Sequence, residues 1–236
     1  MINSDGHHAL IYLFTTYHYD WSVVVQYFGV LMSGVVYTVE IALTSLVFAM
    51  ILGLFIALLR MAPWAPVRMV GFTYVQLFRA LSLYVYMLLL YFGLPAVTGI
   101  SFGARTAAII SLTLLHGAYI SEVYRAAIGS IDPEQHEAAA SLGMSPATAF
   151  VNVTFPQAGR IAVPTLVNSF VDLIKDSSIV ATIGAGDLMY KTIQTVSSTH
   201  RSFELYTTTG LIYLTLVIIV SQAAVQLERR LRVHLA

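Results

Sequence analysis

Residues 132–156 read DPEQHEAAASLGMSPATAFVNVTFP, and they form the most strongly patterned stretch of the chain. Asp132-Pro133 is a typical helix start, since Asp caps the first backbone N–H groups and Pro suits the first helical position. Gly143 is placed to end that helix in a left-handed conformation. Ser145-Pro146 starts a second helix by the same logic, and Phe155-Pro156 is expected to end it. The stretch therefore predicts two short helices that meet at a glycine.

The rest of the chain is too apolar for a soluble protein. Of its 236 residues, 58% are hydrophobic and 10% are charged, whereas an average soluble chain has about 25% charged residues. Lysine plus arginine and aspartate plus glutamate both number 12, so there is no basic excess to suit nucleic acid. The absence of cysteine excludes disulfides, thiolate metal sites and cysteine nucleophiles. We therefore expect an all-α integral membrane protein.

The membrane spans are predicted from stretches without charged residues. The length of each stretch is compared with the ~20 residues that a helix needs to cross a bilayer. Only Glu40 divides the first apolar region, and no Pro or Gly lies beside it to make a tight return, so we expect one long helix there. Residues 1–29 are expected to form an extracytoplasmic segment without a cleavable signal peptide, and to include an interfacial stretch from Trp21 to Phe28. Five spans result, at about residues 30–59, 70–94, 105–129, 160–183 and 205–227.

Basic residues in the loops predict the orientation. Seven arginines fall on one side of the five predicted spans, which the positive-inside bias makes cytoplasmic: Arg60, Arg68, Arg125, Arg160, Arg229, Arg230 and Arg232. The amino terminus is then outside, the carboxyl terminus inside and residues 132–156 cytoplasmic. A six-span alternative would place the amino terminus inside. The last three arginines suit a stop-transfer anchor, with a lipid headgroup site as the other interpretation.

The cytoplasmic segment carries a family resemblance. On physical grounds alone its alanine-rich surface fits either a knob that docks into a partner or an ordinary connecting loop. Glu137-Ala138-Ala139, then Gly143, then Val153-Thr154-Phe155-Pro156 resembles the EAA signature of ABC-importer permease subunits. That signature is EAA, three residues, Gly, nine residues and Ile-x-Leu-Pro. The spacing matches, and Val153 and Phe155 replace Ile and Leu conservatively.

Within that superfamily the chain is most similar to importers of polar amino acids, of the histidine, glutamine, arginine and glutamate type. The similar stretches are Tyr74–Arg79, Tyr91–Pro95, Gly117–Tyr119 with Glu122 and Arg125, and Leu173–Ser178. The chain departs from the family pattern at three places. Ala80-Leu81-Ser82 replaces Gly-Thr-Pro, Gln76 stands where an acid is common, and His116 stands where a small residue is common.

The resemblance implies partners and a mechanism. It implies a second permease, identical or related, two ATPase subunits and an external solute-binding protein, all at a bacterial cytoplasmic (inner) membrane. Glu137, Ala138, Ala139, Gly143 and Pro156 would couple the chain to an ATPase. ATP and Mg would belong to that ATPase, because neither lysine of this chain follows a glycine as a P-loop lysine must. The chain is thus expected to be no enzyme and to hold no cofactor or metal.

Ionisable residues inside predicted spans are candidates for the translocation path, because a charge in a bilayer costs at least a few kcal/mol. On the fourth span, Asn168, Asp172, Lys175 and Asp176 fall on one helix face, and Lys175 is expected to pair with Asp172. The alternative is an internal ion cluster that never contacts substrate. Three further ionisable residues lie within predicted spans and are candidates for the same reason: Glu40, Arg79 and His116.

Each of these three has a competing interpretation. Arg79 suits a substrate carboxylate, or else an ion pair with an acid elsewhere in the bundle. Glu40 suits an ammonium group, or else an interfacial water. His116 suits the path or a pH sensor, or else a hydrogen-bonded packing role. A local pair between Glu122 and Arg125 is expected to steady the entry to residues 132–156.

Other functions fit the sequence less well. A stand-alone secondary carrier would typically show inverted repeats, and the chain shows no convincing repeat. An intramembrane enzyme would need a catalytic motif such as His-Glu-x-x-His or Gly-x-Ser-x-Gly, and the chain has neither. An ABC permease for an osmolyte or another small solute shares the EAA signature and remains the main alternative.

Overall fold

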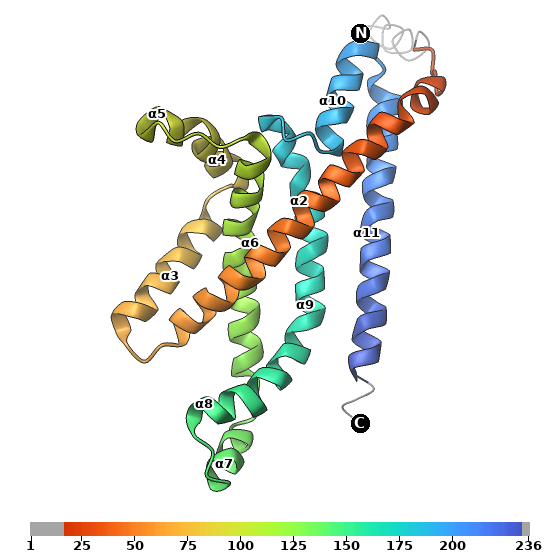
Figure 1. The fold of residues 1–236 in the computed structure, drawn as a ribbon. Coiled ribbons are helices and arrows are strands. Elements are labelled where there is room, and N and C mark those ends of the chain that lie inside the picture. Colours follow the sequence, from red (N-terminus) through yellow and green to blue (C-terminus); the bar gives the residue numbers. More distant parts are fainter. Residues whose placement is uncertain (1–16, 233–236) are drawn as a thin grey trace, which may run out of the picture.

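The computed structural model describes residues 17–232, and all regular structure in this range is helical (Figure 1). Three helices are long and apolar enough to cross a membrane: α2 (Ser22–Met61), α6 (Ala104–Gly129) and α11 (Ser202–Arg232), the last over Ser202–Ala223. A bent pair of helices is a fourth candidate. The side chains of the carboxyl-terminal arginines lie outside the described residues, so the stop-transfer interpretation stays a prediction.

Helix α2 is a single element from Ser22 to Met61 and continues unbroken through Glu40, as predicted. Its predicted start at residue 30 is wrong, because the expected interfacial stretch is part of the helix. Asp20 supports the earlier start by accepting hydrogen bonds from the Ser22 backbone N–H (3.0 Å) and hydroxyl (2.5 Å). These two hydrogen bonds hold the pKa of Asp20 below its usual value.

The second predicted span, 70–94, is not one straight helix. Helix α3 (Ala65–Ala80) and the helices from Leu83 to Thr98 meet at 101°. Leu81 and the following serine have extended backbones, with ψ of 144° and 133°, and so break the helix without a proline. The break falls where Ala80-Leu81-Ser82 departs from the family's Gly-Thr-Pro pattern.

Two tyrosines hold the two arms of this bend on α6. The Tyr74 hydroxyl of α3 donates to the Leu114 carbonyl at 2.7 Å. The Tyr86 hydroxyl of α4 (Leu83–Leu88) donates to the Ser111 carbonyl at 2.8 Å. After α4 the chain makes a π-helical turn, η1 (Leu89–Gly93), and then α5 (Leu94–Thr98).

The caps predicted for residues 132–156 are confirmed. Helix α7 (Pro133–Ser141) is capped by Asp132, which accepts from the Glu134 N–H at 3.0 Å. Gly143 has φ +73°. Its N–H donates to the Ala140 carbonyl, and the N–H of the next residue, Met144, donates to the Ala139 carbonyl. This pair of bonds is a Schellman motif.

The predicted end of the second short helix at Pro156 is wrong. Helix α8 (Pro146–Ala149) passes through the π-helical turn η2 (Phe150–Thr154) directly into α9 (Phe155–Asp176). A proline lacks the N–H that an α-helix would use, and a wider π-turn just before it absorbs that loss. The same arrangement precedes Pro95, which follows η1.

The chain between the fourth and fifth predicted spans contains a helix that the sequence analysis missed. Helix α9 continues into the 3₁₀ segment η3 (Ser177–Ile183), and α10 (Leu188–Thr199) follows. Asp187 caps α10 by accepting from the Met189 N–H at 3.0 Å, and its side chain is fully buried. Burial raises the pKa of Asp187 to about 6.

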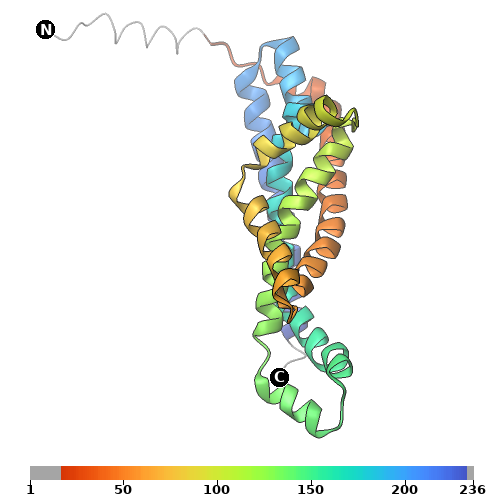
Figure 2. The same cartoon turned by 90° about the vertical axis from the view of Figure 1, so that its left-hand side faces the viewer.

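The two ends of the bundle differ in character. Helices α7 and α8 protrude at the end where α11 finishes, whereas α10, α4 and α5 lie at the opposite end (Figures 1 and 2). Between them α6 and α9 run along the bundle, and α2 crosses both obliquely (Figure 1). Their cores include the fully buried residues Ile41, Leu112 and Leu173. The short capped helices are therefore an appendage at one end of the apolar bundle.

Helix α2 approaches its neighbours closely at glycines. A Cβ on Gly34 would lie 2.7 Å from the Leu188 Cα, which is backbone and has little room to move. A Cβ on Gly53 would lie 2.8 Å from Ile120 Cγ2. Gly29 lies on the same helix with nothing within 4 Å of such a Cβ. The α2–α10 contact therefore depends on Gly34.

We predict that Gly34→Val destabilises the protein and that Gly29→Val does not. Overpacking costs about 1–3 kcal/mol, and each ~1 kcal/mol corresponds to roughly 2–4 °C in Tm for a chain of this size. Thermal unfolding of the detergent-solubilised variants should show Gly34→Val lower by several degrees. Equal melting of the two variants would show that α10 moves away from α2 at little cost.

Candidate functional site

A polar pocket of about 580 Å³ opens between α3, α6 and α9. It contains four of the residues predicted for the translocation path, which come from three helices. The pocket is lined by Arg79 of α3, by His116, Tyr119, Glu122 and Val123 of α6, and by Thr165, Asn168, Ser169, Asp172 and Asp176 of α9. We call it the α3–α6–α9 pocket.

Helix α9 supplies the acidic wall of this pocket. The predicted pair between Lys175 and Asp172 is confirmed, with Nζ 3.2 Å from Oδ1. Both side chains are more than half exposed, at 57% and 60%. An exposed pair of this kind contributes at most about 1 kcal/mol, so Asp172 can exchange Lys175 for another cation at little cost.

His116 of α6 contacts the acidic wall at the end that lies farther from α7 and α8. Its Nε2 lies 3.0 Å from Asp176 Oδ2, and the imidazole is almost fully buried. The ring lies 6.2 Å from that of Tyr119. Asp176 is the last residue of α9, so this contact fixes the point where α9 changes into η3.

Arg79 faces the acidic wall from α3. Its guanidinium lies 5.1 Å above the ring of Tyr119 and 3.6 Å from Glu122. The cation–π contact orients the guanidinium without using its hydrogen-bond donors. The Arg79 side chain remains 42% exposed, which leaves donors for a carboxylate in the pocket.

Glu122 pairs with three arginines at the end of the pocket that lies nearer to α7 and α8. Besides Arg79 it pairs with Arg60 at the end of α2, and with Arg125 at 2.9 Å. The pair with Arg125 was predicted from the sequence, and the other two were not. Arg60 is the most buried of the three, with 13% of its side chain exposed. One carboxylate thus ties α2, α3 and α6 together.

Glu40 lies apart from this pocket. It pairs with Arg105 in the first turn of α6, and the guanidinium of Arg105 lies 5.5 Å over the ring of Tyr37. The structure therefore brings together Arg79, His116 and the acids of α9, while Glu40 belongs to a separate ion pair at the start of α6.

The sequence analysis missed three polar residues of the pocket: Tyr119, Thr165 and Ser169. Helical periodicity offered a signal for each, because each lies three residues from a predicted polar residue: His116, Asn168 and Asp172 respectively. Within residues 17–232 no group of three His, Cys, Asp or Glu side chains is arranged to hold a metal ion.

The 132–156 segment presents a mostly exposed surface beyond the bundle. Glu137 and Ala138 are exposed, whereas Ala139 packs inward. Leu142, at the tip, is 78% exposed. Thr154 Oγ1 lies 3.2 Å from His136 Nε2, so the two arms of the segment are joined by a hydrogen bond. A rigid knob with an apolar tip results.

A membrane-embedded helical bundle with a polar pocket and a protruding knob has the architecture of a transporter permease. Residues 49–233 match the family described as the binding-protein-dependent transport system inner membrane component. The chain belongs to this family, whose members are permease subunits of ABC transporters in the inner membrane and are not themselves catalytic.

Individual relatives agree with this assignment. The probable amino-acid ABC transporter permease protein PatM of Vibrio harveyi is 36% identical over 90% of this chain and 96% of its own length. The arginine transport system permease protein ArtQ of Bacillus subtilis (strain 168) is 32% identical over 90% and 97%. A crystal structure of an amino acid ABC transporter with histidines has 35% identity, a TM-score of 0.86, and coverage of 91% and 100%. These similarities favour a permease over the carrier and enzyme alternatives.

We predict that Glu122→Gln destabilises the bundle more than Arg125→Gln does. Removing one partner of a buried ion pair costs about 3–5 kcal/mol, and the 25% exposure of Glu122 places its loss at the lower end. Arg125 is exposed, so its removal should cost less than about 1 kcal/mol. Thermal unfolding in detergent measures both. Similar melting temperatures would show that the Arg60 charge is stabilised by water and does not depend on Glu122.

Proposed function

We propose that this chain is the permease subunit of an ATP-driven importer that moves a polar amino acid, or a close analogue, from an external binding protein across the membrane. The observation that carries the proposal is the α3–α6–α9 pocket, where Arg79 faces Asp172 and Asp176. A zwitterion needs a cation for its carboxylate and an anion for its ammonium group. The names of relatives such as ArtQ and PatM support an amino-acid substrate.

Five spans are part of the same proposal. The five proposed spans run alternately toward and away from the α7–α8 end (Figure 1). They are α2, the bent pair from Ala65 to Thr98, α6, α9 with η3, and α11. Arg60, Arg68 and Arg125 lie toward that end, and they support a cytoplasmic 132–156 segment by the positive-inside bias. The amino terminus is then outside and the carboxyl terminus inside.

The partners follow from the family and from the shape of the appendage. Two ATPase subunits bind below, a second permease copy or related chain completes the path, and an external binding protein delivers substrate. Glu137, Ala138, Ala139, Gly143 and Pro156 belong to the knob that enters an ATPase cleft. ATP and Mg are bound and used by the ATPase. An osmolyte or another small solute is the alternative cargo.

We predict that Asp172→Asn lowers transport with little change in folding, because its pair with Lys175 is exposed. The hydrogen bond to a charged ammonium group is worth about 1.5–3 kcal/mol, so uptake at limiting substrate should fall about tenfold or more. The measurement is ATPase stimulation and uptake in vesicles that hold the complete transporter, with loaded binding protein and a panel of amino acids.

Asp20→Asn is the matched control, since it removes an acid outside the pocket where Asn can still accept from Ser22. If both variants transport like the wild type, Asp172 does not contact substrate. If no amino acid in the panel stimulates the wild-type ATPase, the proposed cargo is wrong.

We predict that Gly143→Asp blocks transport and leaves membrane insertion intact. Gly143 has φ +73° and open space around its Cα, so aspartate and asparagine strain the turn to a similar small degree, and aspartate in addition places a charge at the docking tip. Gly143→Asn, which tolerates this conformation without a charge, should retain most activity. Intact substrate-stimulated ATPase in the Asp variant, measured in reconstituted vesicles, would rule out the docking role.

A further inference from the structure

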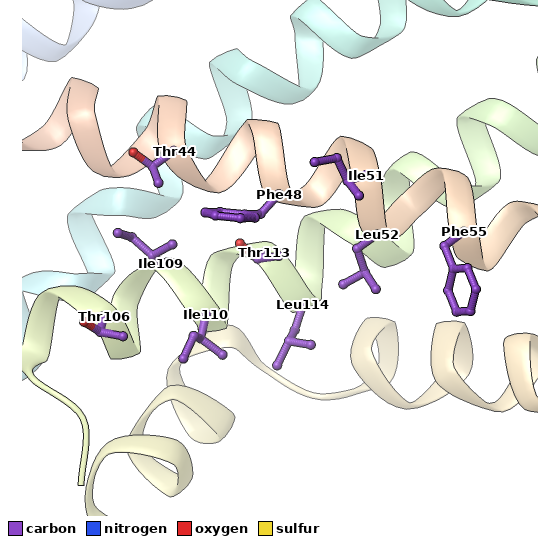
Figure 3. A pocket seen from close by; sticks show the side chains of 10 residues that line it. All are labelled: Thr44, Phe48, Ile51, Leu52, Phe55, Thr106, Ile109, Ile110, Thr113 and Leu114. Atoms are coloured by element: carbon purple, nitrogen blue, oxygen red, sulfur yellow. The ribbon is translucent and has the colours of Figure 1, made fainter.

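A second, apolar pocket of about 690 Å³ lies between α2 and α6 (Figure 3). We call it the α2–α6 groove. It is separate from the α3–α6–α9 pocket, because Ile110 of the groove and Tyr119 of the pocket are nine residues apart and so point to opposite sides of α6.

The walls of the groove change character along its length. Thr44 and Thr106 lie at one end, and Phe55 lies at the other (Figure 3). Between them the groove is lined by side chains such as Phe48, Ile109 and Ile110. Phe48 and Phe55 are each more than half exposed. In a protein of the inner membrane, an exposed apolar surface of this kind is covered either by hydrocarbon or by another apolar protein surface.

An ion pair stands at the threonine end. Glu40 lies one helical turn before Thr44, and Arg105 lies one turn before Ile109. The two side chains pair with each other and remain 49% and 42% exposed. The guanidinium has five N–H donors, so the pair leaves donors on Arg105 and an oxygen on Glu40 facing outward. The ring of Tyr37 under Arg105 suits the membrane interface.

The length of the groove matches one leaflet. Along α6, which runs with the bundle axis (Figure 1), the groove extends from Thr106 in the first turn to Leu114 near the middle of the helix, a rise of about 12 Å at 1.5 Å per residue, which fits within one half of a ~30 Å hydrocarbon core. A spanning helix of a partner permease would need an apolar surface across the whole core. A groove that is charged at one end and closes near the midplane has instead the polarity of a single lipid.

We propose that the α2–α6 groove binds an outer-leaflet phospholipid with a zwitterionic headgroup, its acyl chain on Phe48 and Ile110 and its headgroup on the ion pair. The phosphate accepts hydrogen bonds from Arg105, and the ammonium group donates to Glu40. Guanidinium–phosphate and carboxylate–ammonium contacts are both charge-assisted. A lipid held in this way packs against both helices along the seam between them.

The complete transporter is placed in nanodiscs that contain equal amounts of phosphatidylethanolamine and phosphatidylglycerol. After release into detergent, native mass spectrometry measures which lipid the transporter has retained. We expect the wild type to retain phosphatidylethanolamine. Arg105→Gln removes the phosphate contact, and Ile110→Trp fills the groove. Each should lower retention about tenfold, the effect of losing ~1.4 kcal/mol of binding.

Two matched controls separate the groove from general lipid contact. Lys191→Gln removes a cation on α10, and Ile219→Trp enlarges an exposed residue on α11 outside the groove. Both should retain phosphatidylethanolamine like the wild type. Equal retention by all four variants, or preferred retention of phosphatidylglycerol, would overturn the proposal.

A cysteine probe tests the competing occupant and does not depend on the tryptophan variant folding. The chain has no cysteine, so Phe48→Cys introduces a single thiol in the groove. If a second permease covered this surface, an apolar maleimide would fail to label the thiol in the assembled transporter whether or not phosphatidylethanolamine is added, and the lipid proposal would fail. A thiol that is labelled in the assembled transporter without phosphatidylethanolamine and is protected when phosphatidylethanolamine is added supports it.

Discussion

The bundle depends on the neutralisation of charge near the end of α6 that leads into α7. Three guanidinium groups from α2, α3 and α6 converge on the Glu122 carboxylate. In a medium of low polarity an unpaired charge is costly, so Arg60 and Arg79 cannot move far without a substitute anion. The same residue therefore fixes the end of α2 and helps to position Arg79 over Tyr119.

Local features of the sequence predicted local structure well. The caps of α7 and α8, the left-handed Gly143 and the Lys175–Asp172 pair all depend on residues within a few positions of each other. Their energies are set by hydrogen bonds and charges that the sequence spacing defines. The third span was also predicted within a residue of α6, because the uncharged run from Thr106 to Ser121 fixes most of that span.

Features that depend on contacts between helices were not predictable in the same way. The 101° break at Leu81-Ser82 lacks a proline, and it is held by two tyrosines that bond to carbonyls of α6. Helix α10 is too short and polar to register as a span, and it is held by the close approach at Gly34. Pro156 looked like a helix end because a π-turn cannot be distinguished from a break in sequence.

The pocket shows the same division. Periodicity on α9 placed Asn168, Asp172 and Asp176 on one face, but nothing in the sequence showed that His116 and Arg79 face them from other helices. The sequence also did not distinguish Glu40 from the acids of the pocket, because its partner Arg105 is identified only by the structure. Assigning intramembrane charges to a path therefore requires the packing and not only the spans.

The connections of the pocket walls give the proposed coupling a direction. Helix α6 leads through Ser130 to Asp132 into α7, and α9 begins directly at η2, so each wall is continuous with one arm of the 132–156 segment. Helix α6 contains no proline, whereas α9 contains Pro164 between the segment and Asp172. In the mechanism we propose, α6 moves as a rigid lever and α9 yields near Pro164. The His116–Asp176 contact lies beyond that point and holds the walls together at the outer end. A displacement of the knob should then separate the walls at Glu122 and Thr165 more than at His116, which opens the pocket toward the cytoplasmic side first.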